Sequence, residues 1–310
     1  MPTRRTKASG TRRGVGAVEI DSSLLKRLRL PTLDESGDKE ARGRVLVVGG
    51  SREMPGAVVL AGTGALRAGA GKLQIATVAS AAISVGVAVP EARVFALHET
   101  ARGAVDAHGV GDIAEHLREA RAVLVGPGMI DDPSIAALVR AVTRSVGDAT
   151  LVLDANALNA LERVPDLLKS LGGGAILTPH ATELAEMTGE SEEEIGRDRR
   201  GAALRAAKHF GAVVALKGRE TFIASPDGVE VYVNRAGNVG LATSGSGDAL
   251  AGVVAGLAAR GADALTAAVW GVHAHALAGE RLARRVGRVG YLARELLDEI
   301  PSVLDGLEGK

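Results

Sequence analysis

The chain has 310 residues, enough for one large α/β domain or two small ones. Its 37 basic and 37 acidic residues balance, which argues against nucleic acid or an anionic membrane as a partner, and its lack of cysteine excludes disulfides, thiolate catalysis and cysteine-ligated metals. No apolar run reaches the roughly 18 residues of a membrane span and no signal-peptide segment is apparent, so we expect a cytoplasmic protein that binds small molecules or its own copies.

The first segment of the chain is basic. Pro2 to Gly16 contains no acidic residue and almost nothing to bury, which predicts a disordered, solvated tail, with a nucleic-acid arm as the less favoured alternative. Leu24 to Leu33 predicts a short helix or an extended arm, and Glu35 to Gly43 a polar linker. The sequence therefore predicts a tail and lead-in over residues 1–43 and one folded domain over residues 44–310.

In the predicted domain, short apolar runs alternate with helical patterns. The runs typical of buried strands are Val45–Val48, Leu73–Thr77, Arg93–Leu97, Ala122–Val125, Leu151–Asp154, Ala175–Thr178 and Val213–Lys217. Helices are predicted over Gly56–Ala68, over Ser134–Val146, and after Gly245 and Asp263, and a hairpin-like pair over Thr221–Ala224 and Val229–Val233. Continuous apolar strands separated by helices indicate an α/β fold with a mainly parallel sheet covered on both faces.

Ligands of such sheets bind where the strands end, so the segments after the strands are the ones of interest. Gly245-Ser246-Gly247-Asp248 precedes a long apolar helix. Glycines allow successive N–H groups to converge, and the helix N-terminus adds partial positive charge, which together favour an anion cradle. Asp248 could accept the proton of a substrate hydroxyl that attacks a phosphoryl group. The alternative is an ordinary first-turn aspartate next to a glycine turn.

Two other glycine turns follow predicted strands. Gly126-Pro127-Gly128 and Gly49-Gly50-Ser51 either let a ligand approach the backbone or merely turn the chain. The segment Gly49 to Gly56 does not supply the G-x-G-x-x-G pattern expected after the first strand of a dinucleotide-binding fold. This argues against an NAD-dependent dehydrogenase.

A proline turn follows the strand that ends near Thr178. Pro179 directs His180 and Glu183 toward the crevice. His180 either hydrogen-bonds a substrate or is a satisfied loop histidine. Glu183 is either a first-turn acid or an outer-shell partner of a magnesium ion.

Further polar segments follow two other strands. Lys217-Gly218-Arg219-Glu220-Thr221 could wrap a nucleotide, although a lone lysine after a strand is more often solvated. Asp154-Ala155-Asn156 is either a capping device or part of the crevice floor. His273 and His275 lie on an apolar helical pattern and are interpreted as structural. With no other His or Cys at ligand spacing, the sequence predicts no zinc or iron site.

Taken in order, these motifs resemble the ADP/ATP-dependent NAD(P)H-hydrate dehydratases, a branch of the ribokinase-like superfamily. The resemblance runs from Val45 to Pro301. It is carried by Gly49-Gly50-Ser51, Pro55-Gly56-Ala57, Gly126-Pro127-Gly128, Leu153 to Leu158, Thr178-Pro179-His180 with Glu183, Leu216-Lys217-Gly218 with Thr221, Gly237-Asn238, Gly245 to Asp248, and His275 with Ala278-Gly279-Glu280. The chain departs from the family's pattern at Met54, Ile130 and Ser244.

The resemblance implies a ribokinase-like fold and a lyase that repairs NADH or NADPH hydrated at C6. The hydroxyl would be phosphorylated by ADP or ATP, and the phosphate would leave as the ring double bond re-forms. A fused epimerase domain, common in the family, does not fit in the residues before Arg44, so only the S epimer is expected to be repaired by this chain alone. The resemblance also implies a homo-oligomer, since members of the family often form tetramers.

The resemblance also implies roles for individual residues. Asp248 would be the base, and the N–H groups of Gly245, Ser246 and Gly247 would stabilise the transferring phosphoryl group. The residues expected to hold the adenine nucleotide are Lys217, Gly218, Arg219, Glu220, Thr221 and Gly247. Those expected to contact the hydrated dinucleotide are Ala57, Gly128, His180 and Asp248. A magnesium ion bridging the phosphates would be placed mainly by the nucleotide, with Glu183 as a candidate outer-shell partner.

Two other functions are compatible with these motifs. A hydroxymethylpyrimidine or hydroxyethylthiazole kinase of the same fold would share the cradle and Asp248 but release a stable phosphorylated alcohol. His180 favours the dehydratase, since pyrimidine and sugar kinases commonly have Asn after that proline. In a non-catalytic nucleotide-sensing module, Asp248 would have no chemical task.

Overall fold

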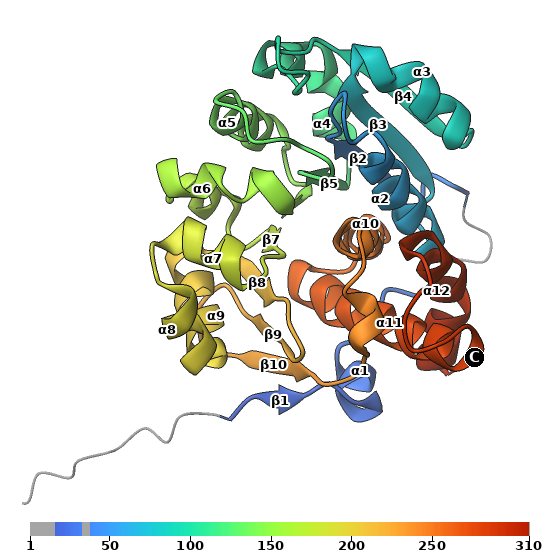
Figure 1. Cartoon of the computed structure of the whole chain (residues 1–310), viewed down its shortest axis with the longest axis vertical. Coiled ribbons are helices and arrows are strands. Elements are labelled where there is room, and N and C mark those ends of the chain that lie inside the picture. Colours follow the sequence, from blue (N-terminus) through green and yellow to red (C-terminus); the bar gives the residue numbers. More distant parts are fainter. Residues whose placement is uncertain (1–15, 33–37, 310) are drawn as a thin grey trace, which may run out of the picture.

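The computed structural model describes residues 16–32 and 38–309, so the predicted basic tail lies, up to residue 15, outside the described residues. Its centre is a ten-stranded sheet in the order β1-β10-β9-β8-β7-β6-β5-β2-β3-β4 (Figure 1). The neighbours are parallel except for β9, which is antiparallel to both β8 and β10. The mainly parallel sheet predicted from the sequence is confirmed.

The strands follow the apolar runs closely. They are β1 (Val18–Glu19), β2 (Arg44–Val48), β3 (Lys72–Val78), β4 (Ala92–Leu97), β5 (Ala122–Val125), β6 (Thr150–Leu153), β7 (Ala175–Leu177), β8 (Val213–Leu216), β9 (Thr221–Ala224) and β10 (Val231–Asn234). Every residue of β5, β7 and β8 is buried. Strands covered on both faces have no polar side, which is why they appear in the sequence as continuous apolar runs.

Helices cover both faces of the sheet (Figure 1). The first cluster of buried side chains lies against α2 (Gly56–Arg67), α10 (Ser246–Ala259), α11 (Ala264–Arg285) and α12 (Ala293–Glu308). The second lies against α4 (Ala114–Glu119), α5 (Ile135–Ser145), α6 (Ala160–Arg163), α7 (Ala181–Thr188), α8 (Glu192–Arg197) and α9 (Arg199–Phe210). The remaining helices are α1 (Ser22–Arg27), α3 (Ala79–Ala88) and the 3₁₀ turns Ala107–Ile113, Ala155–Ala157, Leu167–Leu171 and Val239–Leu241. No helix in the two described ranges is both long and apolar enough to cross a membrane.

The lead-in segment packs onto the rest of the molecule. β1 pairs in parallel with β10, the outer strand of the antiparallel part of the sheet. Asp21 caps α1 by accepting a hydrogen bond from the Leu24 amide at 2.8 Å, and both Leu24 and Leu25 are buried in the first core. Trp270 of α11 donates its indole N–H to the carbonyl of Leu28. Of the segment Leu24 to Leu33, predicted as a short helix or an extended arm, the part up to Arg27 is helical and belongs to α1. The domain boundary between residues 43 and 44 stays a prediction.

Helices α2 and α10 lie in close contact because small residues face each other between them. Gly252 of α10 has no side chain, and a Cβ at this position would lie 2.1 Å from the carbonyl oxygen of Ala61 in α2. The same holds one turn later, where a Cβ on Gly256 would lie 2.4 Å from the carbonyl oxygen of Ala65. This contact matters for function because α10 begins at Ser246, next to the predicted cradle.

We expect Gly252→Ala to lower the free energy of unfolding by about 1–3 kcal/mol, because the added methyl group forces α2 and α10 apart. Chemical denaturation measures the change. Gly196→Ala, in α8, is the matched control, since a Cβ there meets nothing within 4 Å. The control should leave stability unchanged or raise it by about 0.5–1 kcal/mol. Equal effects of the two substitutions would contradict the packing account.

Candidate active site

A hollow of about 300 Å³ opens where several strands end and α10 begins. We call it the Asp248 hollow. It is lined by Met54, Ala57, Gly128, Met129, Ala155, Asn156, Glu183 and Asp248. Four residues predicted from the sequence to belong to the site, far apart along the chain, therefore meet here: Ala57, Gly128, Glu183 and Asp248.

The glycine turn after β5 brings the backbone close to its neighbours. Gly126 has φ 129°, and a Cβ on it would lie 1.8 Å from the carbonyl oxygen of Asp154. Gly128 has φ 69°, and a Cβ there would lie 2.4 Å from the carbonyl oxygen of Met54. These contacts hold the segments after β2, β5 and β6 against one another, so the floor of the hollow depends on both glycines.

The predicted cradle is formed at the start of α10. Gly245 adopts φ 84° and is the N-cap residue, so the chain turns sharply before entering the helix. The amide of Ser246 donates to the Thr243 carbonyl at 3.2 Å, whereas no backbone acceptor within the described ranges receives the amides of Gly247 and Asp248. Free first-turn amides and the positive end of the helix dipole are suited to an anion.

Asp248 lies in this first turn, and the pKa of its carboxyl group is raised. Burial raises the pKa of Asp248 to about 6, the nearby charge of Asp154 acts in the same direction, and Lys217 opposes the shift. A carboxyl group with a pKa near neutrality can both accept and release a proton in the physiological range. The electrostatics therefore suit a general base better than an ordinary helix-capping acid.

Lys217, just after β8, is held between two carboxylates. Its Nζ lies 3.0 Å from Oδ1 of Asp154 and 3.6 Å from Oε2 of Glu183. Burial disfavours the ammonium charge, but the two acids outweigh burial and raise the pKa of Lys217, which stays protonated. A Cβ on Gly247 would lie 3.6 Å from the same Nζ, so the ammonium group stands beside the start of α10.

Asp154 owes its position to a buried hydroxyl. Its Oδ1 accepts a hydrogen bond of 2.7 Å from Oγ1 of Thr178, and only 2% of the residue is exposed. The side chain of Asp154 makes no capping hydrogen bond, and Ala155 and Asn156 line the hollow. The segment is therefore better described as part of the crevice floor than as a helix cap. Ala155 adopts φ 50°, the only positive φ of a non-glycine residue in the described chain.

His180 and Glu183 form a capping box at the start of α7. The Glu183 amide donates to Nδ1 of His180 at 3.3 Å, and the His180 amide donates to Oε2 of Glu183 at 2.7 Å. Glu183 is therefore a first-turn acid that also lines the hollow and contacts Lys217. His180 is exposed and does not line the hollow.

The rest of the predicted nucleotide segment leads away from the Asp248 hollow. Gly218 and Arg219 are exposed, and Glu220 accepts a 2.8 Å hydrogen bond from Arg235. Thr221 is buried at the start of β9. Lys217 is the residue of this segment that reaches the hollow, through its ion pair with Glu183.

The two helical histidines have partners in the fold. His273 contacts Oδ1 of Asn234 at 2.8 Å. His275 Nε2 lies 3.2 Å from Oγ of Ser246, a residue of the predicted cradle, and both are buried. Burial lowers the pKa of His275 to about 4, so the imidazole is neutral at physiological pH. The sequence did not reveal this contact, because it joins residues 29 positions apart on two helices.

Carboxylates outnumber cations around the Asp248 hollow. Asp154, Glu183 and Asp248 surround one ammonium group, that of Lys217. In residues 16–32 and 38–309, no group of three or more His, Cys, Asp or Glu is arranged to hold a metal ion by itself.

The sequence profile of the NAD(P)H-hydrate dehydratase family matches residues 45–302. The chain belongs to the NAD(P)H-hydrate dehydratase family. It is 49% identical over 290 residues to the ADP-dependent (S)-NAD(P)H-hydrate dehydratase of Xanthomonas campestris, covering 93% of this chain and 96% of that one.

Solved structures agree with the family assignment. The ADP/ATP-dependent NAD(P)H-hydrate dehydratase of Bacillus subtilis, co-crystallised with ATP and Mg²⁺, superposes with a TM-score of 0.78 at 30% identity over 94% of this chain and 99% of that one. A ribokinase-like protein from Enterococcus faecalis gives 0.80 at 23% identity over 94% and 96% of the two chains, which supports the fold. The predicted ribokinase-like fold of this dehydratase-family member is confirmed.

Proposed function

We propose that this chain is an ADP-dependent (S)-NAD(P)H-hydrate dehydratase, which uses ADP to remove water from NADH or NADPH hydrated at C6 and releases AMP and phosphate. The observation that carries the proposal is Asp248, a carboxylate of raised pKa in the first turn of α10 beside free amides. The Xanthomonas relative, which matches almost end to end, bears this activity in its name.

In the proposed reaction, Asp248 accepts the proton of the C6 hydroxyl while that oxygen attacks the β-phosphoryl group of ADP. The C6–O bond of this phosphate ester then breaks, so that phosphate leaves, and C5 loses a proton to water as the double bond between C5 and C6 re-forms. Amides of Gly245, Ser246 and Gly247 would stabilise charge on the phosphoryl group, a contribution of about 3–4 kcal/mol per well-placed donor. Because the Ser246 amide already donates to Thr243, we assign the larger share to Gly247.

The adenine nucleotide is proposed to lie along Lys217 to Thr221 and the amide of Gly247. Lys217 would supply a fixed positive charge to the phosphates, held in place by Asp154 and Glu183. Gly218, Arg219, Glu220 and Thr221 would contribute mainly backbone groups. Ala57 and Gly128, which line the Asp248 hollow, would contact the hydrated ring.

A magnesium ion fits the charges of this hollow. Three carboxylates with a single lysine repel a phosphate chain, and oxygen-rich surroundings suit Mg²⁺. When bound with the nucleotide, the ion would neutralise phosphate charge. Glu183 would stand in its outer shell, through water, because the side chain also binds the His180 amide.

We propose that His180 contacts the hydrated dinucleotide. Because the same side chain caps α7, a substitution that keeps the cap separates an effect on substrate binding from an effect on folding. We expect His180→Asn to keep α7 capped, since Asn is a good N-cap residue, and to raise KM for the hydrate about tenfold through loss of one hydrogen bond. Thermal unfolding should be unchanged, whereas His180→Ala should cost about 1 kcal/mol of stability. An unchanged KM in His180→Asn would mean that His180 caps α7 but does not contact the substrate.

Incubation of the purified chain with the S form of hydrated NADH and ADP tests the function. We expect the absorbance of the reduced nicotinamide to return, with one phosphate and one AMP released for each molecule restored. The R form should not react without an epimerase. A stable phosphorylated alcohol would instead indicate the kinase alternative, which the close relatives do not favour.

We also propose that the protein acts in the cytoplasm and that four copies of the chain assemble into a homotetramer. Ile83 and Val87 stand one turn apart on α3 and are 84% and 78% exposed. Exposed apolar side chains at such spacing favour contact with another copy. Light scattering coupled to size exclusion should give four times the chain's 31.6 kDa, and a monomer would contradict this part.

A further inference from the structure

Asn156 lines the Asp248 hollow, and the orientation of its side-chain amide is fixed. Its Nδ2 donates a hydrogen bond of 2.7 Å to the carbonyl oxygen of Met129. A carbonyl oxygen can only accept, so the atom that faces it must be the amide nitrogen, and Oδ1 must be the other end of the side chain. The nitrogen therefore joins the turns after β5 and β6, which leaves the oxygen for another partner.

The oxygen of this side chain is accessible. Within residues 16–32 and 38–309, no side chain or backbone group donates to Oδ1 of Asn156. The buried polar atoms without a partner in these residues include Oδ1 of Asn159 but not Oδ1 of Asn156, which therefore has exposed surface. An accessible acceptor of fixed orientation is suited to a donor on a bound molecule.

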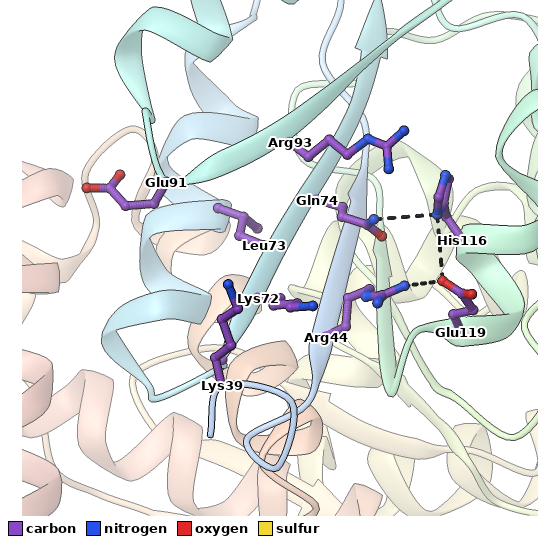
Figure 2. A pocket seen from close by; sticks show the side chains of 10 residues that line it. Lys39, Arg44, Lys72, Leu73, Gln74, Glu91, Arg93, His116 and Glu119 are labelled. Atoms are coloured by element: carbon purple, nitrogen blue, oxygen red, sulfur yellow. Dashed lines mark hydrogen bonds and ion pairs between the residues drawn. The ribbon is translucent and has the colours of Figure 1, made fainter. Parts of the chain in front are cut away.

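A second hollow contains an amide that a ligand does not reach. It has a volume of about 370 Å³ and lies where β2, β3 and β4 begin, at the edge of the sheet opposite to the Asp248 hollow. Nε2 of its Gln74 faces Nδ1 of His116 at 3.5 Å (Figure 2), and Oε1 of Gln74 is buried. Of these two hollows, only the Asp248 hollow presents a side-chain amide oxygen to a ligand.

The backbone next to Asn156 is strained. Ala155 adopts φ 50°, a positive value that residues with a Cβ rarely adopt. Strained residues persist where the surrounding structure holds them, and they cluster at active sites and ligand-binding segments. The conformation of Ala155 therefore supports a role in binding for the turn that includes Asn156.

Three of the eight residues that line the Asp248 hollow have polar side chains, and two of these already have tasks. Asp248 is proposed to accept the proton of the C6 hydroxyl, while Glu183 caps α7 and contacts Lys217. The third is Asn156. The other five lining residues are Met, Ala or Gly, which offer apolar surface to the carbon atoms of a ring.

The hydrated nicotinamide ring has a further polar group that this hollow must accommodate. Its carboxamide is attached to C3, directly across the ring from C6, so the group that binds the C6 hydroxyl is not the one that binds the carboxamide. A carboxamide without a partner in the hollow loses its hydrogen bonds to water, which weakens binding. Its N–H groups need an acceptor, and Oδ1 of Asn156 is the accessible one that remains.

We propose that Oδ1 of Asn156 accepts a hydrogen bond from the carboxamide N–H group of the hydrated ring and so selects substrates that have this carboxamide. The proposal rests on the proposed dehydratase function for the identity of the ligand. Asn156 positions the ring and takes no part in proton or phosphoryl transfer. Asn156→Ala should therefore raise KM for hydrated NADH about tenfold and leave kcat and KM for ADP nearly unchanged.

Binding of hydrated NADH and of one analogue tests this contact without turnover. The analogue is the hydrated, reduced form of acetylpyridine adenine dinucleotide, in which a methyl group replaces the NH₂ of the carboxamide. Both are titrated calorimetrically into the full chain with α,β-methylene ADP, which cannot transfer its β-phosphoryl group. We expect the unmodified chain to bind hydrated NADH about tenfold more tightly than the analogue. Asn156→Ala should bind the two with about equal affinity.

Asn159→Ala is the matched control. Asn159 lies three residues later, lines neither hollow and makes no side-chain capping bond, so this variant should keep the tenfold preference. Thermal unfolding checks that both variants remain folded. If Asn156 only held the two turns together, Asn156→Ala would weaken both compounds equally, because the bond to Met129 does not distinguish them.

Three results would overturn the proposed contact. The first is equal affinity of the unmodified chain for the two compounds, a result that needs no variant. The second is a tenfold preference that persists in folded Asn156→Ala. The third is no binding of hydrated NADH at millimolar concentration. If hydrated NADH binds with the expected preference but ADP then restores no absorbance, the dehydratase function fails and the contact stands.

Discussion

Asp248→Asn is expected to lower kcat about 10²- to 10⁴-fold, the usual contribution of a general base, while ADP still binds. It should also make the fold more stable at pH 7. The pKa of Asp248 is raised from 3.8 to about 6, so the ionised carboxylate destabilises the fold at neutral pH, and this effect is lost as the pH falls from about 6 toward 3.8. Asn resembles the protonated form, which the fold prefers.

Steady-state kinetics, ADP titration and thermal unfolding together check this result. Asp305→Asn, which neutralises an exposed aspartate on α12, is the control and should leave all three unchanged. A fall in activity together with a lower melting temperature would mean that Asp248 acts through folding. Full activity in Asp248→Asn would remove the proposed base.

Lys217→Met is expected to weaken ADP binding about 10- to 100-fold, because a charge-assisted hydrogen bond to phosphate is worth about 1.5–3 kcal/mol. It should also destabilise the fold by about 3–5 kcal/mol, since Asp154 loses its buried counter-charge. Lys217 lowers the pKa of Asp248, so its removal should raise that pKa further and reduce activity at pH 7.

Titration with ADP and chemical denaturation measure the two effects of Lys217→Met. The matched control is Lys208→Met on α9, which removes an exposed lysine and should change neither ADP affinity nor stability by more than about 0.5 kcal/mol. If ADP affinity is unchanged in Lys217→Met, the nucleotide phosphates do not contact this ammonium group.

Much of the fold follows from local sequence patterns. The buried strands appear as apolar runs because both faces are covered, and α10 and α11 follow Gly245 and Asp263 as predicted. Other elements lack such a signal. α12 contains Pro301, which usually interrupts a helix, and α3 has no clear polar face. β1 has two residues whose partners in β10 lie more than two hundred positions away.

The candidate site was predictable to the extent that each motif lies after a strand. Ala57, Gly128, Glu183 and Asp248 meet because parallel strands end at the same edge. The contact between Asp154 and Lys217 was not predictable, since it depends on the order β6-β7-β8, which places residues 63 positions apart side by side. The capping bond of His180 is a local feature that the sequence left open.

The pH dependence of kcat/KM for hydrated NADH tests most directly whether Asp248 is the base. With the pKa of Asp248 at about 6, the rate of the unmodified chain should fall about tenfold per pH unit below pH 6, because only the ionised carboxylate accepts a proton. The residual rate of Asp248→Asn should lack this fall, although ADP ionises alike in both. If kcat/KM fell equally below pH 6 in the unmodified chain and in Asp248→Asn, Asp248 would not be the base.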